Sequence, residues 1–220
     1  MKLPISDRLL ACCAFVNPGD RIADVGCDHG YLSIHLLTNG TARSAIASDL
    51  REGPLQSAVI NAEKYGVRDR MEFFLSDGVR SIPRDFDTLV CAGMGAHTMI
   101  SILEAAPWLK SSRYRMVLQC QIKTPMLRQY LTEQGWTIPR EAVLRDGKFL
   151  YTVMEVIFDP SAPKLTPGQC YIPPALSGDD ADEYCRWVLA DLNKIVTSRG
   201  DSADPFLIKA LNELKKENAL

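Results

Sequence analysis

The chain has 220 residues, a formal net charge of −2 at pH 7 and 46% hydrophobic residues. This length suits one ordinary domain with an additional segment, and the composition is that of a globular protein rather than a disordered chain. The near-neutral charge excludes a strong overall field toward a polyanion, so a nucleic-acid partner has to be held by a local basic patch.

The sequence contains no run that resembles a membrane segment, because no apolar stretch approaches the roughly 18 to 20 residues required. A short apolar run near the start is preceded by Asp7 and Arg8 and lacks a small-residue cleavage site. We therefore expect no signal peptide, no membrane partner and a cytoplasmic protein.

The cysteines are scattered and show no CxxC pair with metal-ligand spacing, so we expect no metal site. We interpret them as reduced, partly buried thiols that act as small hydrophobic residues. They are Cys12, Cys13, Cys27, Cys91, Cys120, Cys170 and Cys185.

Short apolar, β-branched runs alternate with segments of helical hydrophobic spacing through the first part of the chain. Such alternation indicates βαβ units and a parallel sheet. The predicted strands cover residues 21–26, 44–49, 70–77, 86–93 and 114–121. The predicted helices cover residues 6–16, with Ser6 as N-cap, and 30–39, 53–65, 96–106 and 123–134.

The pattern changes after Gly135. Residues 136–144 and 149–158 are predicted to form two strands joined by a turn at Asp146-Gly147. Five parallel strands followed by an antiparallel hairpin are the arrangement of the Rossmann-like class I methyltransferase sheet. By this fold-level analogy we expect that α/β fold over residues 1–158.

The remainder of the chain differs in composition. Residues 159–178 contain five prolines and two glycines, which is typical of a linker. Within residues 179–220 we predict a coiled-coil-like hairpin of two amphipathic helices, 179–197 and 205–218. Such short helices are stable only when they pack on another element, and we interpret an apolar stripe that includes Trp187 as a packing seam rather than an RNA contact.

The first predicted strand runs into a loop with two glycines. Gly26 and Gly30 allow a ligand to approach the backbone closely, and the following helix directs N–H groups at negative charge. A dinucleotide site requires GxGxxG, whereas this GxxxG pattern suits S-adenosylmethionine, which has no pyrophosphate. The ammonium group of S-adenosylmethionine is one that the Asp24 carboxylate can hold. The alternative interpretation of the loop is a plain tight turn before a helix, without a ligand.

Three further loops follow predicted strands in the order that a nucleoside site requires. Asp49 ends the second strand, where a carboxylate accepts hydrogen bonds from both ribose hydroxyls; a surface aspartate is the alternative. Asp77 and Gly78 follow the third strand, where a short acidic loop borders an adenine ring. The fourth strand runs into Ala92, Gly93, Met94 and Gly95, which we expect to border both the methyl donor and its acceptor.

The motifs together resemble the bacterial tRNA methyltransferases that modify N1 of adenine 22. The resemblance covers essentially the first 158 residues, and its most specific part is the pair DVGCDHGYLS and AGMG. One departure is visible, because the family usually has Pro where Cys120 follows Gln119. The matching segments are SDRL (6–9), DVGCDHGYLS (24–33), AIASD (45–49), GPLQSA (53–58), SDGV (76–79), AGMG (92–95), LQ (118–119) and LRQYL (127–131).

The resemblance implies transfer of a methyl group from S-adenosylmethionine to adenine N1 in the D-arm of tRNA. Members also carry a C-terminal helical domain, which matches the predicted hairpin. The fourth loop lacks the Asn/Asp-Pro-Pro-aromatic motif, which argues against methylation of an exocyclic amine. A small-molecule methyltransferase and a non-enzymatic binding protein that retains the fold remain alternatives, and the oligomeric state stays open.

Two residues of the first loop are our candidates for catalysis. We expect Asp28 to act as an electrostatic partner for the methylated base and His29 to form a hydrogen bond with it. Capping of the next helix or contact with the cofactor amino group is the alternative for Asp28, and a structural hydrogen bond is the alternative for His29. Arg8 is expected to reach the cofactor carboxylate or an RNA phosphate, with a surface helix position as the alternative.

Other side chains are weaker candidates for RNA contacts. Tyr31 and Tyr151 are able to stack on a base, although packing is the commoner role for a tyrosine. Solvent exposure is the default reading for the basic clusters that offer phosphate contacts. These clusters are Arg68/Arg70, Arg80/Arg84, Lys110/Arg113/Arg115 and Arg140/Arg145/Lys148.

Overall fold

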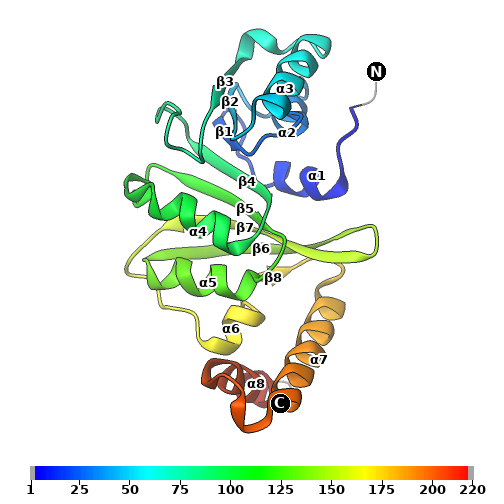
Figure 1. Ribbon diagram of the computed structural model, residues 1–220, viewed down its shortest axis with the longest axis vertical. Coiled ribbons are helices and arrows are strands. Elements are labelled where there is room, and N and C mark those ends of the chain that lie inside the picture. Colours follow the sequence, from blue (N-terminus) through cyan, green and yellow to red (C-terminus); the bar gives the residue numbers. More distant parts are fainter. Residues whose placement is uncertain (1–2, 218–220) are drawn as a thin grey trace.

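The computed structural model describes residues 3–217, and their strands form one eight-stranded sheet in the order β3-β2-β1-β4-β5-β7-β6-β8 (Figure 1). The strands from β3 to β5 in this order pair in parallel, and β7 runs antiparallel to β5 and β6. The predicted Rossmann-like α/β fold with a terminal antiparallel hairpin is therefore confirmed. The strands are β1 Arg21–Val25, β2 Ser44–Asp49, β3 Met71–Leu75, β4 Thr88–Met94, β5 Arg115–Cys120, β6 Trp136–Asp146, β7 Phe149–Phe158 and β8 Leu176–Ser177.

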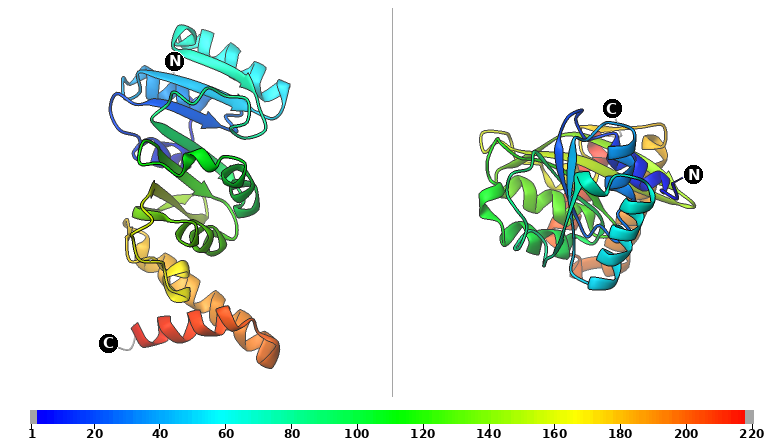
Figure 2. Two further views of the ribbon diagram at one scale, coloured as in Figure 1. Left: turned by 90° about the vertical axis from the view of Figure 1, so that its left-hand side faces the viewer. Right: turned by 90° about the horizontal axis from the view of Figure 1, so that it is seen from above.

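Helices cover both faces of the sheet, which explains why β1, β2 and β5 are buried along almost their whole length (Figure 2). One core contains side chains of α1, α2 and α3, and the other contains those of α4 and α5. The α-helices are α1 Asp7–Cys13, α2 Tyr31–Thr38, α3 Glu52–Lys64, α4 Ala96–Glu104, α5 Thr124–Glu133, α6 Pro167–Tyr171, α7 Ala181–Arg199 and α8 Pro205–Glu217. Short 3-10 turns lie at Arg68–Arg70, Pro107–Leu109 and Gly200–Ser202.

The first helix illustrates how far local signals determine an element. The Ser6 hydroxyl accepts a hydrogen bond from the Leu9 N–H, so the predicted N-cap is confirmed. The helix ends at Cys13, before the predicted end at residue 16. Cys12 and Cys13 are buried, as are four of the other five cysteines, in keeping with their interpretation as small hydrophobic residues.

The predicted linker range, 159–178, contains two short elements that the sequence analysis did not anticipate. Helix α6 begins with a capping box, in which Thr166 accepts the N–H of Gln169 and the Gln169 side chain accepts the N–H of Thr166. Pro167 occupies the first helical turn, where a missing N–H costs nothing. Strand β8 then pairs in parallel with β6. Part of the proline-rich segment therefore adds a short strand to the edge of the sheet, beside β6.

The two C-terminal helices lie at the end of the molecule opposite β3 (Figure 1). Tyr184 and Val188 of α7 pack on Val143 of β6, and Leu192 packs with α8. These α7 positions recur every four residues and form the buried stripe. Trp187 lies beside that stripe with 57% of its surface exposed, so its assignment to the packing seam is wrong.

A fully buried ion pair anchors this region to the sheet. Arg128 of α5 and Glu141 of β6 are both completely buried, and Arg128 Nη2 lies 2.6 Å from Glu141 Oε1. The Arg128 guanidinium also donates to the backbone oxygens of Cys170 and Tyr171 and lies 3.4 Å from the Tyr184 hydroxyl. One guanidinium therefore connects α5, β6, α6 and α7. Among residues 3–217, no helix combines the length and hydrophobicity needed to cross a bilayer.

Candidate active site

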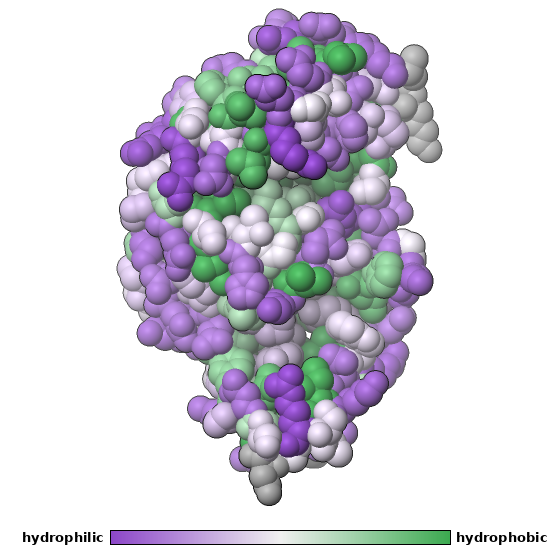
Figure 3. Space-filling model, in the orientation of Figure 1, coloured by the Kyte–Doolittle hydropathy of each residue, from purple (hydrophilic) through white to green (hydrophobic). Residues whose placement is uncertain are grey.

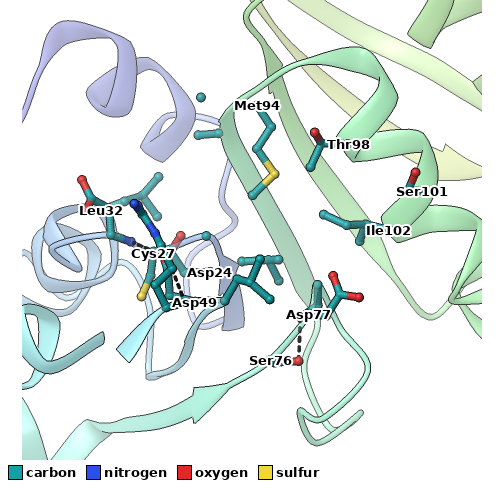
Figure 4. Close-up of a pocket in the computed structure, with 18 of the residues that line it drawn as sticks. Asp24, Cys27, Leu32, Asp49, Ser76, Asp77, Met94, Thr98, Ser101 and Ile102 are labelled. Atoms are coloured by element: carbon teal, nitrogen blue, oxygen red, sulfur yellow. Dashed lines mark hydrogen bonds and ion pairs between the residues drawn. The ribbon is translucent and has the colours of Figure 1, made fainter. Parts of the chain in front are cut away.

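A cavity of about 450 Å³ opens at the carboxyl ends of the parallel strands (Figure 4). The loops after β1, β2 and β3 and the end of β4 form most of its wall. Because β1 lies between β2 and β4, the chain connections diverge to opposite sides here. This switch point is where open α/β sheets bind ligands.

The structure brings most of the predicted cofactor residues together at this cavity. The predicted cofactor residues Gly30 and Gly95 are not among its lining residues, and neither is His29, a predicted catalytic residue. Gly30 instead allows α2 to approach α3, since a Cβ there would lie 3.0 Å from the Ala58 Cβ, and Gly95 is the residue before α4. The predicted residues that line the cavity are Arg8, Asp24, Gly26, Asp28, Asp49, Asp77, Gly78, Ala92, Gly93 and Met94.

One wall of the cavity comes from α4, which the sequence analysis did not include. Thr98, Ser101 and Ile102 project from this helix toward the side of the cavity that carries Asp24 and Asp49 (Figure 4). Their spacing places them on one helical face. No local pattern marks such a face of two hydroxyl residues and one isoleucine as a binding surface, and only the position of α4 beside the cavity makes it a wall.

Asp49 is the most firmly held carboxylate of the site. Its side chain is almost completely buried, and its Oδ2 accepts the Asp28 N–H at 3.2 Å while its Oδ1 accepts the Arg51 N–H at 3.0 Å. An ionised carboxylate has about four lone-pair positions, so each oxygen retains capacity for a further donor. The geometry therefore suits two neighbouring hydroxyl groups.

Asp24 is buried more deeply, and its Oδ2 accepts a hydrogen bond from the Ser33 hydroxyl at 2.8 Å. Burial raises the pKa of the Asp24 carboxyl to about 6, because the charged form loses hydration that the hydrogen bond only partly replaces. A cation brought beside Asp24 would favour its ionised form and lower that pKa again.

The end of β4 is shaped by a hydrogen bond to a buried glutamine. The pairing of β4 with β5 shifts between Ala92 and Met94, and the freed Gly93 N–H donates to Gln119 Oε1 at 3.0 Å. Arg8 Nη1 donates to the same oxygen at 2.7 Å. Gly93 has a φ of +80°, and a Cβ there would lie 3.1 Å from Arg8 Nη1. Arg8 is therefore part of the cavity wall rather than an isolated surface arginine.

Cys120, the residue at which the chain departs from the family pattern, stays in the sheet beyond the register shift. Cys120 pairs with Met94 in the sheet, and its Sγ donates to the Ile122 carbonyl oxygen at 3.1 Å. Elsewhere in the cavity, a Cβ at Gly26 would clash with the Met94 methyl carbon. Gly26 thus leaves room for Met94 in a narrow part of the site.

The two predicted catalytic residues lie at the rim. Asp28 has a φ of 49°, and its side chain is 64% exposed. The His29 side chain is 51% exposed, with Nε2 3.8 Å from Asp28 Oδ2. Asp28 also lines the cavity, whereas His29 stacks loosely on Tyr31 with ring centroids 5.7 Å apart. Their catalytic roles remain predictions.

Several basic residues that were candidates for phosphate contacts are paired with carboxylates. Arg115 and Arg140 both lie close to Glu155, at 2.7 and 3.4 Å, and Arg145 pairs with Asp180, which precedes α7, and with Glu183 of α7. At the rim of the cavity, Arg80 lies 3.2 Å from Asp77 and Arg51 lies 4.0 Å from Asp49, and the side chains of both arginines are largely exposed. The described residues contain no cluster of three or more His, Cys, Asp or Glu side chains arranged to hold a metal ion.

The fold and the cavity define a nucleoside-binding protein of the Rossmann-like class. Residues 5–154 match the model of the methyltransferase domain family, and the chain belongs to this family. It is 30% identical over 154 residues to the tRNA (adenine(22)-N(1))-methyltransferase of Bacillus subtilis, which covers 70% of this chain and 65% of that relative. The chain spans less than two thirds of the length of the first curated relatives it matches.

Solved structures extend the likeness to the C-terminal helices. A Streptococcus pneumoniae candidate tRNA methyltransferase for N1 of adenine 22, in complex with S-adenosyl-L-methionine, has a TM-score of 0.83 and 28% identity, covering 96% of this chain and 98% of that one. The tRNA methyltransferase of B. subtilis for the same position has a TM-score of 0.79 and 25% identity, covering 98% and 96%. These findings confirm the resemblance that the sequence motifs indicate.

Proposed function

We propose that this chain transfers a methyl group from S-adenosylmethionine to N1 of adenine 22 in tRNA. The observation that carries the proposal is the cavity with the buried carboxylates of Asp24 and Asp49, at the switch point of a chain in the methyltransferase domain family. The S. pneumoniae structure, which contains S-adenosyl-L-methionine, supports this compound as the methyl donor. The likeness to the B. subtilis enzyme supports adenine 22 of tRNA as the methyl acceptor.

The residues of the cavity fit this cofactor. When bound, S-adenosylmethionine supplies an electrophilic methyl group on a sulfonium. Asp49 accepts hydrogen bonds from the ribose hydroxyls, using the lone pairs that its two backbone contacts leave. Asp24 offers a negative charge to the ammonium group and Arg8 a positive charge to the carboxylate, while Asp77 and Gly78 border the adenine ring.

Adenine N1 carries an in-plane lone pair at neutral pH, so its attack requires no general base. The work of the protein is to hold the ring in line with the methyl group and to favour the positive charge that the ring acquires. Ala92 and Gly93 present backbone at this part of the cavity, and Asp28 offers a carboxylate at the rim. N1 lies on the Watson–Crick edge, so the target adenine has to be unpaired or flipped out of its helix.

Cofactor affinity should fall as the pH decreases through about 6. Burial raises the pKa of Asp24 from 3.8 to about 6 in the unliganded protein, so the carboxylate is charged above this pH and becomes neutral below it. If Asp24 holds the ammonium group, the affinity for S-adenosylmethionine decreases by up to about tenfold per pH unit below the pKa. Isothermal titration calorimetry between pH 5 and 8 measures the effect on the dissociation constant of S-adenosylmethionine.

The matched variant is Asp24→Asn, which keeps the shape and removes the titrating group. Its affinity should be weak and flat over the same pH range. A wild-type affinity that is independent of pH would remove Asp24 from the ammonium site and leave it as a structural partner of Ser33.

Labelled methyl transfer to unmodified tRNA transcripts tests the proposed function. We expect incorporation into a transcript with adenine at position 22 and a reverse-transcription stop at that position, because N1-methylated adenine does not pair. A transcript with guanine at position 22 is the control and should remain unlabelled. Equal labelling of both transcripts would contradict the proposed position.

The same assay separates the alternative functions. Binding of S-adenosylmethionine without transfer to any tRNA would favour a small-molecule acceptor. Absence of cofactor binding by calorimetry would favour a non-enzymatic protein that retains the fold.

A further inference from the structure

A second cavity, of about 400 Å³, lies between the sheet and α7, apart from the cofactor cavity. Its walls are the loop after β5, the beginning of β7 and one face of α7. Figure 3 shows a hollow in this face between the main body of the molecule and the helix pair, bordered by hydrophobic side chains. We call it the α7 cavity.

The α7 cavity is lined by large side chains that the fold leaves accessible. Trp187 is 57% exposed and Ile122 is 63% exposed, although burying either would stabilise the protein. Tyr151 contributes a second aromatic ring from β7. Accessible aromatic side chains beside a hollow of this size suit a flat ligand that inserts between them.

The loop that forms this wall is bonded directly to the loop that floors the cofactor cavity. The Gln121 N–H donates to the Met94 carbonyl oxygen at 2.8 Å, and the Ala96 N–H donates to the Ile122 carbonyl oxygen at 3.2 Å. Ile122 also lies against Gly95, where a Cβ would be 3.2 Å from its Cγ1. Residues that border the two cavities are therefore directly adjacent, as the binding of neighbouring units of one polymer requires.

The α7 cavity has a basic side chain on one side and an acidic side chain on the other. Lys123 supplies an ammonium group at the loop, with Nζ 3.1 Å from His97 Nε2, while Asp191 supplies a carboxylate from α7. A phosphate is attracted to the first side, and the amino group of a base is a suitable donor to the second. An unbranched apolar ligand would use neither charge, whereas a nucleotide would use both.

We propose that the α7 cavity binds a nucleotide of the tRNA next to the methylated adenine, with its base stacked on Trp187 and its phosphate beside Lys123. This inference rests on the proposed function and adds a second contact to it. Sequence-tolerant stacking on aromatic side chains is the common way in which proteins hold unpaired bases. The contact would keep the tRNA in place once the target adenine has left its helix.

Replacing Trp187 by Leu tests the stacking contact. The side chain is exposed, so the fold should be retained, and we expect tRNA affinity to fall about tenfold, in line with the value of one base–aromatic stack. The affinity for S-adenosylmethionine should not change, because Trp187 does not line the cofactor cavity. Ile60→Ala is the control, since Ile60 is 62% exposed on α3 and lines neither cavity.

Two further measurements locate the contact. Lys123→Gln should reduce the salt dependence of tRNA binding by the equivalent of about one phosphate contact. Tryptophan fluorescence of the wild type should be quenched by tRNA, and the quenching should be largely lost in Trp187→Phe when compared with Ile60→Ala.

The outcomes separate this inference from the proposed function. If the wild type methylates tRNA while Trp187→Leu binds it as tightly as Ile60→Ala, the nucleotide site is overturned and the proposed function stands. If the wild type binds S-adenosylmethionine and methylates no tRNA, the proposed function is overturned and the inference with it.

Discussion

Replacing Asp49 by Ala should weaken the binding of S-adenosylmethionine on the order of 100-fold or more. Two hydrogen bonds from ribose hydroxyls to a charged acceptor are lost, each worth about 1.5–3 kcal/mol. The same change removes the acceptor for the N–H groups of Asp28 and Arg51, so both adjoining loops lose a fixed contact. Isothermal titration calorimetry on the purified chain measures the change in dissociation constant.

Two comparison variants make this result interpretable. Asp49→Asn keeps the size and one acceptor oxygen, so its loss of affinity should be smaller than that of the alanine variant. Asp85→Ala removes an exposed carboxylate that pairs with Arg21 at 3.5 Å outside the cavity, and it should bind the cofactor like the wild type. Unchanged affinity in Asp49→Ala, with the fold intact by circular dichroism, would show that another group holds the ribose.

Replacing Glu141 by Gln should lower the free energy of unfolding by roughly 3–5 kcal/mol, because it leaves the Arg128 charge buried without its counter-ion. For a chain of this size the corresponding fall in Tm is on the order of 10 °C. The effect should extend beyond β6, since Arg128 also holds the backbone of α6 and approaches the hydroxyl of Tyr184. Urea unfolding followed by circular dichroism measures it.

A double variant distinguishes the cost of an unpaired charge from a loss of packing. Arg128→Met with Glu141→Leu removes both charges and should recover most of the stability that the single variant loses. The exposed pair between Arg21 and Glu72 provides the control, and Glu72→Gln should change stability by less than about 1 kcal/mol. A single Glu141→Gln variant as stable as Glu72→Gln would contradict the anchoring role of the pair.

This anchor also bears on how the C-terminal helices should be tested. Removing the chain after β7 would take away α6, α7 and β8, and with them the oxygens that Arg128 contacts in Cys170, Tyr171 and Tyr184. A truncated chain would therefore lose stability as well as any RNA contact. Single changes at exposed positions such as Trp187 are the sharper test.

The sequence by itself determined the order of the elements and the loops that carry the candidate site. Hydrophobic period, N-caps and glycine turns are properties of a few consecutive residues, and Ser6 shows how directly they define an element's start. Once a parallel sheet is inferred, the carboxyl ends of its strands meet at one edge. Asp24, Asp49, Gly78 and Gly93 were expected together for this reason, and all four line the cavity.

Only the tertiary structure decided which residues far apart in the chain share a contact. The Gln119 oxygen joins Arg8 to Gly93, and the buried pair of Arg128 and Glu141 joins four elements. No local pattern marks such partners, because a charged residue in an amphipathic segment reads as exposed until another element covers it. The exposure of Trp187 is the converse case, since the covering of a helix face depends on long-range packing.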